Sequence, residues 1–156
     1  MNPAQLRAAL IECEAMPYGP ESVQEVERLV VAADRLGQPD LQVLARVVAI
    51  SAYLYGGEPT KIYPSFAWVL SAWDRNPQAF TPGTRHHFLW QFKWVTVRLT
   101  DYPQVPLAQI RGALSDMKER YERAGEGLAP YERCSFSVAR HVLGARHPDT
   151  LLAYQR

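Results

Sequence analysis

The chain has 156 residues, of which 47 % are hydrophobic and 21 % charged, and its formal net charge is +1. This length and composition predict a single globular domain over residues 1–156 that buries a core without cross-links, and they argue against a disordered chain. Proteins that bind nucleic acid usually carry a basic excess or stripe. With Lys+Arg 17 against Asp+Glu 16, no nucleic-acid partner is expected.

The N-terminal stretch MNPAQLRAALIECEAM lacks the basic start and the uninterrupted apolar run of a signal peptide. No stretch approaches the run of about 20 apolar residues that crosses a bilayer. The sequence therefore predicts a cytoplasmic protein with no membrane partner.

Helical periodicity dominates the first part of the chain. Asn2 is placed to cap a first helix that starts at Pro3. A second helix is expected after the break MPYGPE, with Ser22 and Glu25 as a capping box and Gly37 at its end.

The next two helices are predicted from Asp40, as a cap, to about Tyr55 and over Ile62–Asp74. The first of these is apolar nearly all round, which is typical of a helix buried between neighbours. Pro64 is awkward within the other helix, so that helix either starts near Pro64 or bends there.

A fifth helix is expected over about Thr84–Leu99, and it contains the stretch FLWQFKW. We interpret this stretch as a buried core helix, with the alternative that one or two of its aromatic rings face a groove. Pro106 can start a sixth helix, a seventh is predicted over Pro130–Leu143, and a short eighth from about Asp149. The apolar stripe of the sixth helix consists of Ile110, Leu114, Met117 and Tyr121.

These elements pair into four helical hairpins that start near residues 3, 40, 84 and 128, a spacing found in helical-repeat arrays. No strand signal accompanies them. The fold class predicted is therefore all-α, a helical-hairpin repeat with seven to eight helices.

The second hairpin, LARVVAISAYLYGGEPTKIYPSFAWVLSAWDRNP, resembles the tetratricopeptide-repeat (TPR) type of α-solenoid. The residues at the places of that family's signature Tyr, Gly, large apolar residue and Pro are Tyr53, Gly57, Phe66 and Pro77. The chain departs from the pattern at Ile62, where the family has a small residue, and Pro77 comes a few residues late.

From Gly57 to DMKERYERAG the chain also looks like uncharacterised repeat proteins of actinobacteria, a likeness that brings no known activity. Since those proteins tend to be longer, the chain is either a short version of such an array or one domain of it.

The resemblance implies a concave face, lined by the first helix of each hairpin, that binds a peptide or a partner helix. Arg and Lys supply charge beside the large area of a Trp, which suits a carboxylate or an extended peptide. For each candidate the alternative is an ordinary solvated side chain. The predicted partner-binding residues are Arg46, Ser51, Tyr55, Gln91, Lys93, Trp94 and Arg98.

Signs of catalysis are few. The chain has no phosphate-binding glycine loop, no GxSxG and no HExxH, and no pair of carboxylates stands in an apolar setting. His86 and His87 are adjacent, so on a helix they point about 100° apart and cannot easily share a metal. No enzyme, cofactor or metal is expected, and a metal site made from His141, His147 and Asp149 is the alternative.

Cys13 and Cys134 fit no zinc-binding spacing. Each lies among apolar residues of an expected helix, so both are predicted to be buried, reduced thiols. A disulfide or redox role is the alternative.

The leading hypothesis is a non-enzymatic protein–protein or peptide interaction module. One alternative is a small regulatory protein, such as an antitoxin, an immunity protein or a peptide-sensing regulator, that acts by binding a partner. Another is a small metal-dependent enzyme. The final stretch HPDTLLAYQR is expected to expose Leu151, Leu152 and Tyr154, which predicts either a homodimer through an uncapped C-terminal helix or a following domain.

Overall fold

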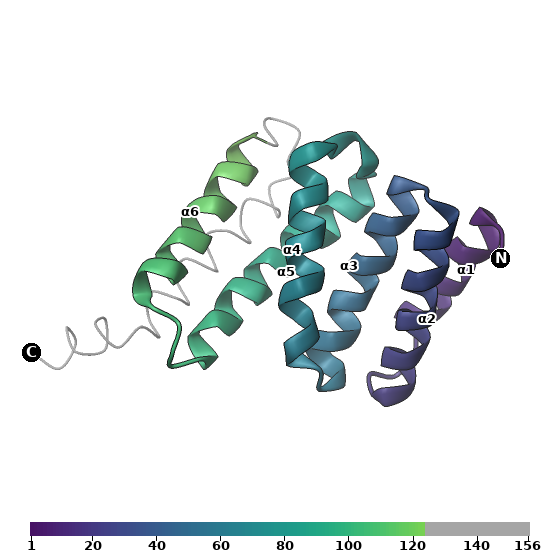
Figure 1. Cartoon of the computed structure of the whole chain (residues 1–156), viewed down its shortest axis with the longest axis horizontal. Helices are drawn as coiled ribbons and strands as arrows, with labels where there is room; N and C mark the ends of the chain where they lie inside the picture. The colour runs from purple at the N-terminus through teal and green to yellow at the C-terminus, as the bar shows by residue number, and fades with distance from the viewer. Residues whose placement is uncertain (124–156) are drawn as a thin grey trace, which may run out of the picture. The chain divides into compact units, whose positions relative to one another are not determined.

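The computed structural model describes residues 1–123, and over these residues it holds six α-helices, two short 3-10 helices and no strand (Figure 1). The all-α class is confirmed for this part of the chain, whereas the repeat arrangement stays a prediction. The expected helices at Pro130–Leu143 and from Asp149 lie outside the described residues. So does the C-terminal surface on which a homodimer was predicted.

Contacts between residues divide the chain into two compact units, Met1–Phe88 and Leu89–Arg156, and the boundary falls within a helix. The prediction of one domain stays a prediction. Each unit is described by itself below.

The first hairpin of unit 1 consists of α1 (Pro3–Glu14) and α2 (Pro20–Leu36). The cap of α1 is confirmed, since the Asn2 side chain accepts a hydrogen bond from the Gln5 N–H and the Gln5 side chain accepts one from the Asn2 N–H, both at 2.9 Å. Gly37 ends α2 with φ 66, a conformation that favours glycine, as predicted.

The predicted capping box at the start of α2 is wrong, because the helix begins earlier, at Pro20. Proline has a fixed φ and no N–H, which suits the first helical position. The Ser22 hydroxyl turns back instead, accepting from the Gly19 N–H at 3.1 Å and donating to the Gly19 carbonyl at 2.9 Å. The Glu25 carboxylate accepts hydrogen bonds from Arg28.

The second hairpin consists of α3 (Pro39–Gly56) and α4 (Pro59–Arg75), and Gly57 ends α3 with φ 86. Asp40 is not the cap of α3, because the helix starts one residue before it and its carboxylate pairs with Arg7 of α1. The fourth helix also begins earlier than predicted, at Pro59, and continues through Pro64, which removes one backbone donor from it.

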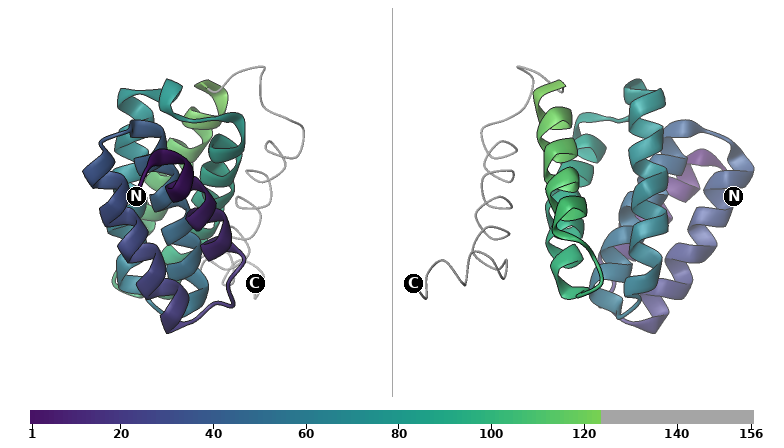
Figure 2. Two further views of the ribbon diagram at one scale, coloured as in Figure 1. Left: turned by 90° about the vertical axis from the view of Figure 1, so that its right-hand side faces the viewer. Right: turned by 60° about the vertical axis from the view of Figure 1, so that its left-hand side comes forward.

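Helix α3 contacts α1, α2 and α4, and these helices lie side by side in Figures 1 and 2. Eleven of its residues, between Leu41 and Leu54, are buried. The prediction that this helix is enclosed by neighbours is confirmed, and α3 forms the centre of unit 1.

A cluster of aromatic rings forms the part of the unit 1 core where α4 and α5 (Pro82–Arg98) meet. The chain passes from α4 through a 3-10 turn, η1 (Pro77–Ala79), into α5. Phe88 is fully buried, and its ring centroid lies 5.7 Å from those of Phe66 and Trp73 and 5.6 Å from that of Phe80. The first residue of FLWQFKW is therefore a core residue.

The described part of unit 2 contains the rest of α5, the 3-10 turn η2 (Leu99–Asp101) and α6 (Leu107–Arg123). Val97 and Ile110 form a small buried cluster against which Leu99, Val105 and Leu114 pack. Leu89 and Phe92 are buried, whereas Trp90 and Trp94 are 40 % and 39 % exposed. FLWQFKW is thus mainly a core helix, and both of its tryptophans reach the surface.

Candidate functional site

A row of three polar side chains crosses three helices of unit 1. His87 of α5 lies between Glu14, at the last residue of α1, and Ser51, in the middle of α3. Its Nδ1 is 3.3 Å from Oε1 of Glu14, and its Nε2 is 3.4 Å from Oγ of Ser51. The row joins residues that are far apart in the sequence.

Burial differs along this row. The Glu14 side chain is 45 % exposed and that of His87 29 %, whereas Ser51 is 8 % exposed. Burial lowers the pKa of His87, His86 adds to this effect, and the Glu14 carboxylate opposes it. A neutral imidazole can accept a hydrogen bond at one nitrogen and donate one at the other.

Two tyrosines, each four residues after a member of this row in the sequence, form an aromatic pair. The ring centroids of Tyr18, which follows α1, and Tyr55, in the last turn of α3, are 4.8 Å apart. Both tyrosines are exposed, at 54 % and 52 %. Tyr55 follows Ser51 by four residues, so the two side chains share one face of α3.

We call the five residues of this row and pair the row face. Its members are Glu14, Tyr18, Ser51, Tyr55 and His87. A carboxylate, an imidazole and two phenol rings give it an acidic and aromatic character. Such a face suits a partially desolvated cation, which a carboxylate pairs with and an aromatic ring attracts.

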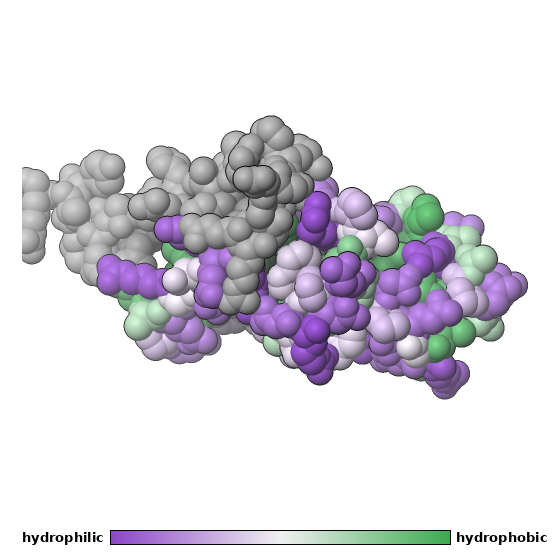
Figure 3. All heavy atoms as spheres, turned by 90° about the horizontal axis from the view of Figure 1, so that it is seen from above, coloured by the Kyte–Doolittle hydropathy of each residue, from purple (hydrophilic) through white to green (hydrophobic). Residues whose placement is uncertain are grey.

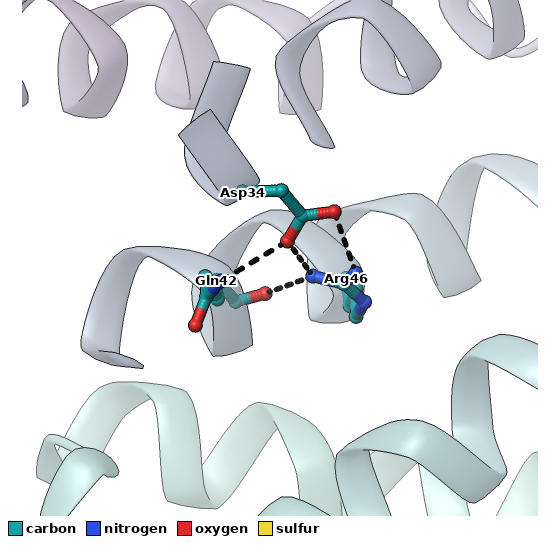
Figure 4. Close-up of polar contacts among 3 residues, drawn as sticks. All are labelled: Asp34, Gln42 and Arg46. Carbon is teal, nitrogen blue, oxygen red and sulfur yellow. Dashed lines mark hydrogen bonds and ion pairs between the residues drawn. The ribbon is translucent and has the colours of Figure 1, made fainter. Parts of the chain in front are cut away.

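Arg46, another predicted site residue, lies elsewhere on α3. It is five residues before Ser51, which places its side chain about 140° away around the helix. Its guanidinium donates to both carboxylate oxygens of Asp34 on α2, at 2.8 and 2.9 Å, as Figure 4 shows. It also lies 3.8 Å from the ring centroid of Trp68 on α4, so Arg46 ties three helices together.

The remaining predicted residues belong to unit 2. Gln91 is 2 % exposed, which leaves a partner little of it to contact. Trp94 is exposed and shares a face of α5 with Arg98, four residues on, whose guanidinium donates to Asp101 at 3.1 Å. The side chain of Lys93 lies outside the described part of the structure.

Sequence reasoning selected Ser51 and Tyr55 but missed Glu14, Tyr18 and His87. Ser51 was visible as a polar residue on an otherwise apolar helix. His87 was considered only as a metal ligand with His86. The chain carries no local signal that α1 and α5 meet at Ser51, because that contact depends on how the helices pack.

Metal and thiol chemistry add nothing to this site. Within residues 1–123, no three His, Cys, Asp or Glu side chains gather where they could hold a metal ion. Cys13 is buried and its thiol is free, as predicted, while Cys134 lies outside the described residues. None of the described helices is long and apolar enough to cross a membrane.

Compared with family models, curated proteins and solved structures, the chain matches none of them.

Proposed function

We propose that the protein is a non-enzymatic interaction module, built as a TPR-like α-solenoid, that binds a basic segment of a partner protein on the row face. The observation that carries this proposal is the exposed Tyr18–Tyr55 pair beside the Glu14–His87–Ser51 row. Tyrosine is among the residue types enriched where binding surfaces gain most of their energy.

The packing of unit 1 supports the solenoid part of the proposal. Successive helices pack against one another, and the first helices of the two hairpins, α1 and α3, also contact each other. This pattern is expected where hairpins stack and their first helices line one face. Apart from Tyr18, which follows α1, the residues of the row face belong to α1, α3 and the start of α5, which would be the first helices of three hairpins.

The chemistry of the row face indicates the partner. A Lys or Arg side chain can lie against the tyrosine rings while its charge faces the Glu14 carboxylate, which is 45 % exposed. A single contact of this kind is weak, so the remaining affinity would come from the backbone and apolar side chains of the partner segment.

The test is binding of a panel of peptides, matched in length and differing in charge, measured by isothermal titration calorimetry. We expect basic peptides to bind, Tyr55→Ala and Glu14→Gln each to weaken binding by about tenfold, and Tyr55→Phe to retain it because the ring remains. Asp74→Asn, at an exposed carboxylate of α4 outside the row face, is the control. Equal binding of acidic and basic peptides, or no effect of Tyr55→Ala, would refute the proposal.

A second candidate function is covalent acyl transfer, favoured by the order of the Ser51–His87–Glu14 contacts. A nucleophile, a base and an orienting carboxylate follow one another as in a hydrolytic triad. It ranks second because Ser51 lies within α3, where backbone N–H groups are engaged in the helix rather than aimed at an oxyanion. Labelling by a fluorophosphonate probe that is lost in Ser51→Ala would favour it.

A regulatory role as an antitoxin, an immunity protein or a peptide-sensing regulator stays an alternative, and each would act through binding of this kind.

A further inference from the structure

The side of the α1–α2 hairpin that faces away from the core carries two pockets of about 620 and 510 Å³. Arg28 of α2 lines both, so the pockets adjoin. At this end of the chain, on the right of Figure 3, hydrophobic and hydrophilic patches alternate on the surface. We call the surface formed by these two pockets the outer groove.

The two ends of the outer groove carry opposite charges. Glu12, Glu21 and Glu25 line the larger pocket, and Arg28 and Arg35 line the smaller one. Glu21, Arg28 and Arg35 are spaced by seven residues, so they form one stripe along α2, with each step drifting only about 20° around the helix. The stripe is acidic at its start and basic at its end.

Apolar groups lie between and beneath these charges. Met16 and the buried Cys13 line the acidic pocket, and Val31 and Ala32 line the basic one. Val31 is 49 % exposed. A second helix laid along the stripe would cover these groups.

Another face of α2 forms ion pairs with the second hairpin, α3–α4. Glu27 accepts a hydrogen bond from Lys61 of α4 at 2.7 Å, and Asp34 pairs with Arg46 of α3. These two carboxylates are also seven residues apart. The outer stripe repeats this spacing with both signs of charge, a layout in which α2 can pair with a copy of itself.

From this self-complementary stripe we infer that two copies of the chain associate through their outer grooves, with the two α2 helices antiparallel about a two-fold axis near Arg28. In that arrangement Glu21 of each copy faces Arg35 of the partner subunit, since the two positions are equally far from Arg28. A two-fold interface requires such self-complementarity. Each Arg28 is already neutralised by Glu25, at 2.6 Å, which limits repulsion at the axis.

The contact is small. The stripe from Glu21 to Arg35 is about 21 Å long. Two helices paired over this length bury less than about 1,200 Å² in total, an area typical of weak or transient association. The dimer is therefore expected at high protein concentration and is weakened by salt, because its charge pairs are exposed.

The test is sedimentation equilibrium of the full chain between about 10 µM and about 1 mM. We expect a monomer–dimer equilibrium for the wild type. Glu21→Arg places two arginines opposite each other at both ends, and Arg35→Glu places two glutamates there, so each variant alone should be monomeric. Circular dichroism checks that both variants remain helical.

Mixing the two variants is the decisive experiment. Glu21→Arg carries two basic ends and Arg35→Glu two acidic ends, so an equimolar mixture should form a heterodimer, and the double variant should again form a homodimer. The inference is overturned if the wild type is monomeric throughout, if the single variants dimerise as it does, or if the mixture stays monomeric. A dimer that survives both changes would use another surface.

Discussion

The guanidinium of Arg46 lies 3.8 Å from the ring centroid of Trp68 while its nitrogen atoms hold the Asp34 carboxylate at 2.8 and 2.9 Å. The side chain of Arg46 is only 14 % exposed, so these contacts are partly shielded from water. A residue that first suggested a binding role is therefore part of the packing between α2, α3 and α4.

Replacement of Arg46 should destabilise the fold. We expect Arg46→Ala to lower the free energy of unfolding by about 1–2 kcal/mol, because it removes a bidentate ion pair and a cation–π contact. Arg46→Lys should recover only part of this, since an ammonium cannot form the two parallel hydrogen bonds. Urea unfolding measures both. Arg98→Ala, which removes an exposed pair with Asp101, is the control and should cost less than about 0.5 kcal/mol.

Acid should destabilise unit 1 through His87. Its pKa in the folded protein is lowered by burial, so below the ordinary value of 6.5 the unfolded chain binds a proton that the folded chain does not. Stability from this group is therefore complete above pH 6.5 and falls as the pH drops below it. Urea midpoints between about pH 7.5 and about pH 5.5 should show this decline, and His87→Gln should reduce it. A wild-type slope in that variant would contradict the assignment.

The thiol of Cys13 should react slowly. Burial raises its pKa, the carboxylates of Glu25 and Glu14 add to this effect, and the thiol donates to the Ser22 carbonyl at 3.7 Å. Because the thiolate is the reactive form, alkylation in native buffer should be at least about tenfold slower than in urea. The measurement uses a Cys134→Ser chain, so that only Cys13 reports. Equal rates in the two solvents would show that the thiol is accessible.

Loss of the Phe88 ring should be severe. Phe88 is fully buried between Phe66, Trp73 and Phe80, and a large-to-small change leaves a cavity there. Phe88→Ala should lower the free energy of unfolding by about 3–5 kcal/mol. Trp94→Ala, on the exposed face of the same helix, should cost far less. Similar losses for the two variants would show that the aromatic cluster is not the core of unit 1.

A methyl group at Gly56 should clash with α2. A Cβ built there would lie 2.8 Å from Cγ2 of Val23, closer than side chains normally approach. Gly56→Ala should therefore destabilise the protein by about 1–3 kcal/mol, even though alanine favours helices. In a Val23→Ala background the same change should be nearly neutral, because the opposing methyl groups are gone. A simple sum of the two single effects would rule out the clash.

The sequence predicted the elements whose signals are local. Asn2 and Pro3 start α1, and Gly37 ends α2, because a cap or a positive φ is decided within a few residues. Ser22 and Asp40 were misassigned for the opposite reason. Pro20 starts α2 before Ser22 can cap it, and Asp40 is engaged by Arg7, which lies in another helix.

The candidate site was only half visible for the same physical reason. Ser51 and Tyr55 could be selected from α3 alone, as polar groups on an apolar helix. Glu14, Tyr18 and His87 become part of the site only when α1, α3 and α5 pack together. Arg46 was chosen for its charge. Only the structure shows that its guanidinium is hydrogen-bonded to Asp34 and packed against the Trp68 ring.

The boundary between the two units falls between Phe88 and Leu89, inside α5. No hinge loop separates them there, since the helical hydrogen bonds of α5 run across the boundary. Loss of helix in either half of α5 removes hydrogen-bond donors or acceptors from the other half, so the turns of this helix open cooperatively across the boundary. Amide hydrogens in the middle of α5 should therefore exchange with solvent more slowly than those in its first turn, whose N–H groups have no acceptor within the helix.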